Sequence, residues 1–136
     1  MIDGFEERDD NSAVTTLSVS LNNYFILPDH TMAETGLIEH LAQSCSALAG
    51  YQALSQATPS ETGLEGNPPV GLIGEVKQFE CRRRPQVGER IKSIVTFGLT
   101  FGNVTLATGQ TFVDEELIAD IKLKIFIQPK AETMTT

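Results

Sequence analysis

The stretch "TMAETGLIEHLAQSCSALAGYQAL", residues 31–54, is too apolar for an ordinary surface helix, so the rest of the chain must fold around it. Its apolar side chains recur at helical spacing and form one wide face: Leu37, Ile38, Leu41, Ala42, Cys45, Leu48 and Ala49. Charged residues are almost absent after His40. We therefore expect a long helix that begins near Thr31 or Thr35, the two candidate N-caps, and is buried on most sides.

Alternating apolar and polar residues predict strands in most of the remaining chain. The expected strands are residues 14–21, 70–81, 89–101, 104–113 and 117–127. Short connections at 102–103 and 114–116 predict antiparallel hairpins. Residues 55–69 have the composition of a loop. Residues 1–13 are expected to be loose or to form a short edge element, and residues 128–136 to be loose.

This order of elements predicts a single α+β domain over residues 1–136. The chain is 40% apolar, which is enough for one packed core. One sheet cannot cover a helix on all sides in a chain of this size. The simplest arrangement is a curved antiparallel sheet wrapped around the helix, with two such units paired.

Composition excludes several classes of function. The formal net charge of −8 argues against a nucleic-acid partner. No apolar run is long enough to span a membrane, and the acidic start "MIDGFEERDD" is unlike a signal peptide. Cys45 and Cys81 lack CxxC spacing, so we expect two reduced, buried thiols in a cytoplasmic protein, with neither a zinc site nor a cofactor.

Positive charge is concentrated in one strip. Six of the ten Lys and Arg residues fall within residues 77–92, and Arg82, Arg83 and Arg84 form its centre. A basic strip on an acidic protein can attract an acidic partner. The alternative is an edge strand whose charges discourage pairing with other strands.

Both histidines and one glutamate lie close together in "NYFILPDHTMAETGLIEHLAQ", residues 23–43. His30 follows Pro28 and Asp29, so it is either a turn residue or a base. Glu39 lies on the apolar helix, where a buried, unpaired carboxylate would be costly, and this favours a functional role. His40 is about 100° around the helix from Glu39, so we expect it to be a dimer-contact or surface residue.

The layout and its motifs resemble the hotdog fold. More narrowly, they resemble the β-hydroxyacyl-acyl carrier protein dehydratases of fatty-acid synthesis and their relatives in aryl-polyene and flexirubin clusters. The matching segments are "NYFILPDH" (23–30), "GLIEHLAQ" (36–43), "GLIGEVKQFECRRRPQVGERI" (71–91) and "DEELIADIKLKIFI" (114–127). The spacing from His30 to Glu39 is shorter than in the family, which implies a deletion of about five residues in the loop after His30.

The resemblance implies a homodimer, or a higher even oligomer, that removes water from a 3-hydroxyacyl thioester carried by acyl carrier protein. His30 would be the base, and Glu39 of the other subunit would be the acid. Arginine binds phosphate well, so Arg82, Arg83 and Arg84 would dock the carrier protein and its phosphorylated arm.

The substrate would contact four further positions. Backbone N–H groups near Gly36, at the start of the helix, would stabilise charge on the thioester oxygen. Gln43 is one turn beyond Glu39 and would orient it by a hydrogen bond. Gly71 and Gly74 would let the acyl chain approach the backbone closely.

Two alternatives stay open. The shorter loop after His30 is compatible with a non-catalytic hotdog subunit that binds acyl carrier protein or an active dehydratase. A thioesterase would use Glu39 to activate water and would not need His30.

Overall fold

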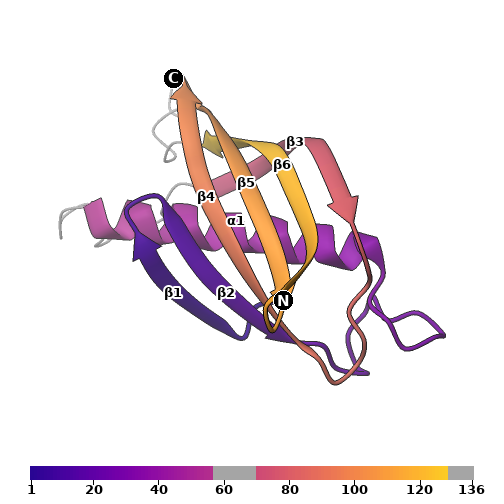
Figure 1. Cartoon of the computed structure of the whole chain (residues 1–136). Coiled ribbons are helices and arrows are strands. Elements are labelled where there is room, and N and C mark those ends of the chain that lie inside the picture. Colours follow the sequence, from indigo (N-terminus) through magenta and orange to yellow (C-terminus); the bar gives the residue numbers. More distant parts are fainter. Residues whose placement is uncertain (57–69, 129–136) are drawn as a thin grey trace.

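The computed structural model describes residues 1–56 and 70–128, which form six strands and one helix. The elements in chain order are β1 (Gly4–Asp9), β2 (Ser12–Ser18), α1 (Glu34–Gln56), β3 (Val70–Cys81), β4 (Arg90–Phe101), β5 (Val104–Val113) and β6 (Glu116–Gln128). The strands form one antiparallel sheet in the order β1-β2-β4-β5-β6-β3. The sheet curves along one side of α1, and its strands cross the helix obliquely (Figure 1).

The β3–β6 half of the sheet agrees closely with the strands predicted from sequence. β3 and β5 coincide with the predicted ranges. β4 begins one residue later than predicted, and β6 is one residue longer at each end. Gly102, in the predicted two-residue turn, has φ +63°, a conformation that glycine adopts without strain. The turn before β6 has two residues, Asp114 and Glu115, because Val113 already pairs with Glu116.

The start of the chain differs from the prediction. Residues 4–9 form an edge strand, β1, so the expected loose start at 1–13 is wrong and its alternative, an edge element, is correct. β2 ends at Ser18, so the predicted strand 14–21 is shifted towards the N-terminus. Leu21, the last residue of the predicted strand, lies outside β2 and is 61% exposed.

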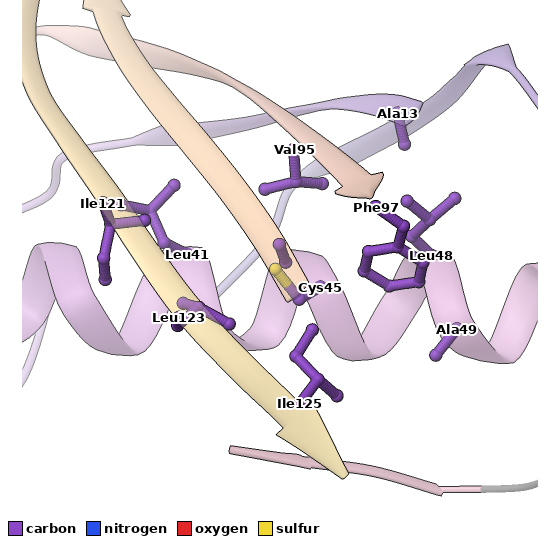
Figure 2. Close-up of a cluster of buried hydrophobic side chains, with 11 residues drawn as sticks. Ala13, Leu41, Cys45, Leu48, Ala49, Val95, Phe97, Ile121, Leu123 and Ile125 are labelled. Atoms are coloured by element: carbon purple, nitrogen blue, oxygen red, sulfur yellow. The ribbon is translucent and has the colours of Figure 1, made fainter. Parts of the chain in front are cut away.

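Apolar side chains of α1 pack against the concave face of the sheet. In Figure 2, Leu41, Cys45 and Leu48 of the helix face side chains from β4 and β6. These strand side chains are Val95, Phe97, Ile121, Leu123 and Ile125. Fully burying one such side chain contributes about 1.5–3 kcal/mol, so the predicted apolar face of the helix is the main attachment of helix to sheet.

The first turn of α1 does not use either of the two predicted N-cap residues. The helix begins at Glu34, and the Ala33 carbonyl accepts hydrogen bonds from Gly36 N–H at 2.9 Å and Leu37 N–H at 3.3 Å. The Thr31 hydroxyl does not cap the helix but donates to Asp29 Oδ1 at 2.6 Å. Neither predicted N-cap residue, Thr31 or Thr35, is therefore the residue before the helix.

The far side of α1 is uncovered. Glu39, Ser46, Tyr51 and Leu54 are exposed, so the single chain buries the helix on one side and not on most sides. The expected loop at 55–69 lies outside the described residues from position 57, and so does the tail from position 129.

Candidate active site

A small hairpin before α1 carries His30. Leu27 N–H donates to Thr31 O, and His30 N–H donates to Leu27 O, both at 2.8 Å. Pro28 and Asp29 form the turn, and His30 follows in the left-handed region with φ 65°. This is the usual backbone of a three-residue hairpin loop, and it leaves the His30 side chain exposed. His30 is thus a turn residue with an exposed imidazole.

The backbone on both sides of His30 is fixed to the segment that precedes β4. Val87 N–H donates to His30 O at 2.9 Å, and Met32 N–H donates to Pro85 O at 2.8 Å. Asp29 Oδ1 also accepts hydrogen bonds from the hydroxyl and the N–H of Thr31, which hold the Asp29 pKa below its ordinary value. The exposed imidazole therefore stands on a rigid support.

Glu39 lies on the open side of α1, with its carboxylate exposed. The predicted bond is present: Gln43 Nε2 donates to Glu39 Oε1 at 2.8 Å. Gln43 Oε1 in turn accepts a hydrogen bond from the Met1 nitrogen at 3.0 Å. The single chain does not remove the Glu39 carboxylate from water, contrary to the expectation from its apolar neighbours in sequence.

His40 is not a surface residue, so the expectation that it contacts solvent or a second subunit is wrong. Its side chain is fully buried under the sheet. Nδ1 lies 3.0 Å from Met1 O, and Nε2 lies 2.9 Å from Ser93 Oγ. Burial lowers the His40 pKa, so the ring is neutral near pH 7. The sequence spacing could have predicted this burial, since His40 lies three residues after Leu37 and four before Ser44, on the inward face of α1.

Gly36 has a packing role that the sequence did not suggest. A Cβ at this position would lie 2.6 Å from Phe25 Cβ and 2.8 Å from Met32 Cγ. The sequence led us to expect a free N–H here for the thioester oxygen. The Gly36 N–H instead donates to Ala33 O. Only glycine lets the hairpin pack this closely against the first turn of α1.

The two glycines expected to contact the acyl chain, Gly71 and Gly74, lie in β3. Gly71 pairs with Ile127 in the β3–β6 ladder. The Phe126 ring fills the space over Gly74 where a Cβ would be. Contact of either glycine with an acyl chain stays a prediction.

The three consecutive arginines have different partners. Arg83 forms paired hydrogen bonds with Glu89, at 2.9 and 3.1 Å, and a further ion pair with Glu116 at 3.1 Å. These carboxylates raise the Arg83 pKa still further. Arg84 binds Asp29 at 3.1 Å and Thr31 Oγ1 at 3.0 Å.

Arg82 differs from its two neighbours, since it lies 3.9 Å from Glu80 and both side chains are more than half exposed. Arg83 and Arg84 therefore hold the chain together. Arg82 is the member of the three that is most available to a partner.

The described residues give little support for a cysteine nucleophile, a metal site or a membrane-spanning helix. Burial raises the pKa of the Cys45 thiol to about 12, so it is not a nucleophile near neutral pH. Cys81 is only partly buried, and its thiol lies 3.3 Å from Arg83 O. Within residues 1–56 and 70–128, no group of three or more His, Cys, Asp or Glu side chains could hold a metal ion, and α1 is not apolar enough to cross a membrane.

Comparison with known proteins identifies the family. The sequence profile of the ApeP-like family, described as ApeP dehydratase, matches residues 1–135. The chain belongs to the ApeP-like dehydratase family. The resemblance to hotdog dehydratases and their aryl-polyene relatives is thereby confirmed. No curated protein matches the sequence significantly.

Solved structures confirm the hotdog fold of this ApeP-like chain. The dehydratase heterocomplex ApeI:P from Xenorhabdus doucetiae superposes with a TM-score of 0.76 at 14% identity, covering 98% of this chain and 86% of that chain. A hypothetical thioesterase from Streptococcus pneumoniae, solved with coenzyme A, gives 0.72 at 8% identity, covering 93% and 86%. The E. coli PaaI protein from the phenylacetic acid degradation operon gives 0.72 at 8% identity, covering 93% and 80%.

The fold therefore occurs both in dehydratases and in proteins named as thioesterases, and the fold alone does not separate the two activities. Membership of the ApeP-like family favours dehydration for this chain. The family match includes the segments that carry His30 and Glu39, but it assigns no role to either residue.

Proposed function

We propose that the chain removes water from a 3-hydroxyacyl thioester on acyl carrier protein, as a homodimer in which His30 of one subunit acts with Glu39 of the other. The proposal rests on a property that the His30 imidazole and the Glu39 carboxylate have in common. Each is exposed on the protein surface, and each stands on a rigid support made by hydrogen bonds. Catalytic groups need such fixed positions.

The pairing of two copies is supported by two uncovered surfaces. Glu39 lies on the open side of α1. In the described part of the chain, the long strand β3 is paired on one side only, with β6. A second copy against these surfaces would cover the open helix face and the strand edge together. It would also take the Glu39 carboxyl out of water, as a general acid at neutral pH requires.

The reaction requires two proton transfers. A neutral imidazole at His30 would remove the proton from C2 of the acyl chain. The Glu39 carboxyl of the partner subunit would give a proton to the C3 hydroxyl, which leaves as water, and a C2–C3 double bond forms. The products are the enoyl thioester and water, so no cofactor is needed.

Both cysteines are free thiols, which fits a reducing cytoplasm.

Two substitutions test the reaction. His30→Ala and Glu39→Gln should each lower the rate of dehydration of a 3-hydroxyacyl thioester by about 10²–10⁴-fold. Gln52→Ala is the matched control, because Gln52 lies on the same helix but binds the Asp10 carbonyl, in the β1–β2 hairpin. Loss of thioester hydrolysis in Glu39→Gln alone would indicate a thioesterase and overturn the proposal.

A binding subunit is the second candidate. One structural relative is the dehydratase heterocomplex ApeI:P, so pairing with a different chain is a specific alternative to a homodimer. A purified chain that forms no homodimer and lacks both activities, but gains dehydratase activity when co-expressed with a second hotdog chain, would favour this candidate.

A further inference from the structure

A chain of hydrogen bonds runs from the centre of the sheet to Glu39. His40 and the two hydroxyl residues Ser93 and Thr111 are fully buried. Thr111 Oγ1 lies 2.8 Å from Ser93 Oγ, which lies 2.9 Å from His40 Nε2. His40 Nδ1 lies 3.0 Å from Met1 O. The Met1 nitrogen and Gln43 complete the path to Glu39.

Elementary donor and acceptor rules fix the direction of every bond in this chain. The Met1 carbonyl can only accept, so His40 Nδ1 carries the hydrogen. Nε2 of the neutral ring then accepts, so Ser93 donates to it and Thr111 donates to Ser93. His40 is therefore fixed in one tautomer by the sheet on one side and by residue 1 on the other.

The backbone of residue 1 is held in place by neighbouring bonds. Asp3 N–H donates to Thr16 O at 2.7 Å, and Asp3 Oδ2 accepts from Ser18 N–H at 2.6 Å. These bonds continue the β1–β2 pairing beyond the start of β1. The His40 bond then fixes the Met1 carbonyl against the helix, so the Met1 nitrogen points at Gln43.

Residue 1 determines which end of the Gln43 amide faces Glu39. The Met1 nitrogen is a donor, so Gln43 turns its carbonyl oxygen towards it. This leaves the Gln43 NH₂ group for the Glu39 carboxylate, at 2.8 Å. If the amide were turned round, its oxygen would face the carboxylate and repel it.

We propose that His40 is a positioning residue: by holding Met1 it orients the Gln43 amide, which holds the Glu39 carboxylate in one position. Its effect on catalysis rests on the proposed dehydratase function, but its effect on Gln43 does not. The N-terminal segment thereby becomes part of the support of the candidate active site, although it lies far from Glu39 in the sequence.

The side-chain ¹H–¹⁵N signals of Gln43 test the proposal directly, whether or not the protein is active. The Gln43 signals should shift in Glu39→Gln, which removes the charged acceptor. They should also shift in His40→Leu, which releases Met1. His40→Gln should return these signals to their wild-type positions, because glutamine has an NH₂ group that can donate to the Met1 carbonyl and an oxygen that can accept from Ser93. Gln52→Leu is the control on the same helix and should leave them unchanged. Unchanged Gln43 signals in a folded His40→Leu protein would overturn the proposal.

Kinetics then separate this proposal from the proposed function. His40→Leu should lower kcat for dehydration by about 10-fold with KM nearly unchanged, and His40→Gln should recover most of the loss. A wild-type protein without dehydratase activity whose Gln43 signals still respond to His40 would overturn the proposed function and support the positioning role. Equal kcat values in wild type and a folded His40→Leu protein would overturn the positioning role in catalysis.

Discussion

Glu39 and His40 are consecutive residues of α1 in opposite environments: the Glu39 carboxylate is exposed, and the His40 imidazole is completely buried under the sheet. In the proposed mechanism Glu39 meets the substrate, and His40 holds the part of the fold that supports Glu39. Substitutions at the two positions should therefore have different consequences, with Glu39 affecting chemistry alone and His40 affecting both stability and chemistry.

The buried His40 makes stability depend on pH. Burial lowers its pKa in the folded protein below the ordinary 6.5, so the unfolded chain takes up a proton at a higher pH than the folded chain. Stability is therefore fully present above pH 6.5 and falls as the pH drops below it, by at most about 1.4 kcal/mol per pH unit. Urea denaturation between pH 5 and 7.5 should show a smaller fall for His40→Gln than for wild type. Equal slopes for both proteins would contradict this assignment.

Two glycines on α1 should respond to alanine in opposite ways. Gly36→Ala would place a Cβ against Phe25 and Met32, and should destabilise the protein by about 1–3 kcal/mol. Gly50→Ala has no atom within 4 Å of the new Cβ and should stabilise by about 0.5–1 kcal/mol through helix propensity. Thermal or urea denaturation of the two variants measures both effects. An unchanged free energy of unfolding in Gly36→Ala would show that the hairpin before α1 packs more loosely than described here.

Arg83 should contribute more to stability than its neighbour Arg82. Arg83 joins Glu89 and Glu116 by paired hydrogen bonds in a partly buried site, so Arg83→Ala should cost about 1–2 kcal/mol. Arg82→Ala removes an exposed contact of 3.9 Å and should change the free energy of unfolding by less than about 0.3 kcal/mol. Comparable losses in the two variants would show that the Arg83 cluster adds nothing beyond an ordinary surface pair.

Arg82 should instead affect the use of a carrier-bound substrate. If it meets the acidic carrier protein, Arg82→Ala should lower kcat/KM for the carrier-bound substrate several-fold. The same acyl group on a short pantetheine thioester should react at the wild-type rate, which serves as the internal control. Equal kcat/KM values for wild type and Arg82→Ala with the carrier-bound substrate would remove Arg82 from the docking surface.

Periodicity predicted most of the fold because burial imposes it. Residues 70–81 and 104–113 have the boundaries of the strands seen, and Leu37, Leu41, Cys45 and Leu48 are buried as expected. The strand Gly4–Asp9 was missed as a definite element, since its exposed charged residues carry no apolar alternation. It is held by backbone pairing to β2, which its own composition does not reveal.

The candidate site was harder to predict, because the type of a polar residue does not reveal which face of α1 it occupies. The Gln43–Glu39 bond followed from i, i+4 spacing and is present. The polarity of His40 suggested a surface position. Its helical spacing from Leu37 and Ser44, both of which are buried, instead predicts the inward face. Glu39 is exposed because the sheet covers only one side of α1, and no local pattern in the sequence tells which side that is.

Mixing two inactive variants shows whether two copies of this chain share one active site. Equal amounts of His30→Ala and Glu39→Gln protein should be unfolded, refolded together and assayed for dehydration. If each site combines His30 of one subunit with Glu39 of the other, half of the refolded dimers carry one intact site, and activity should recover to about a quarter of the wild-type value. No recovery from a refolded, dimeric mixture would contradict an active site shared between two copies of this chain.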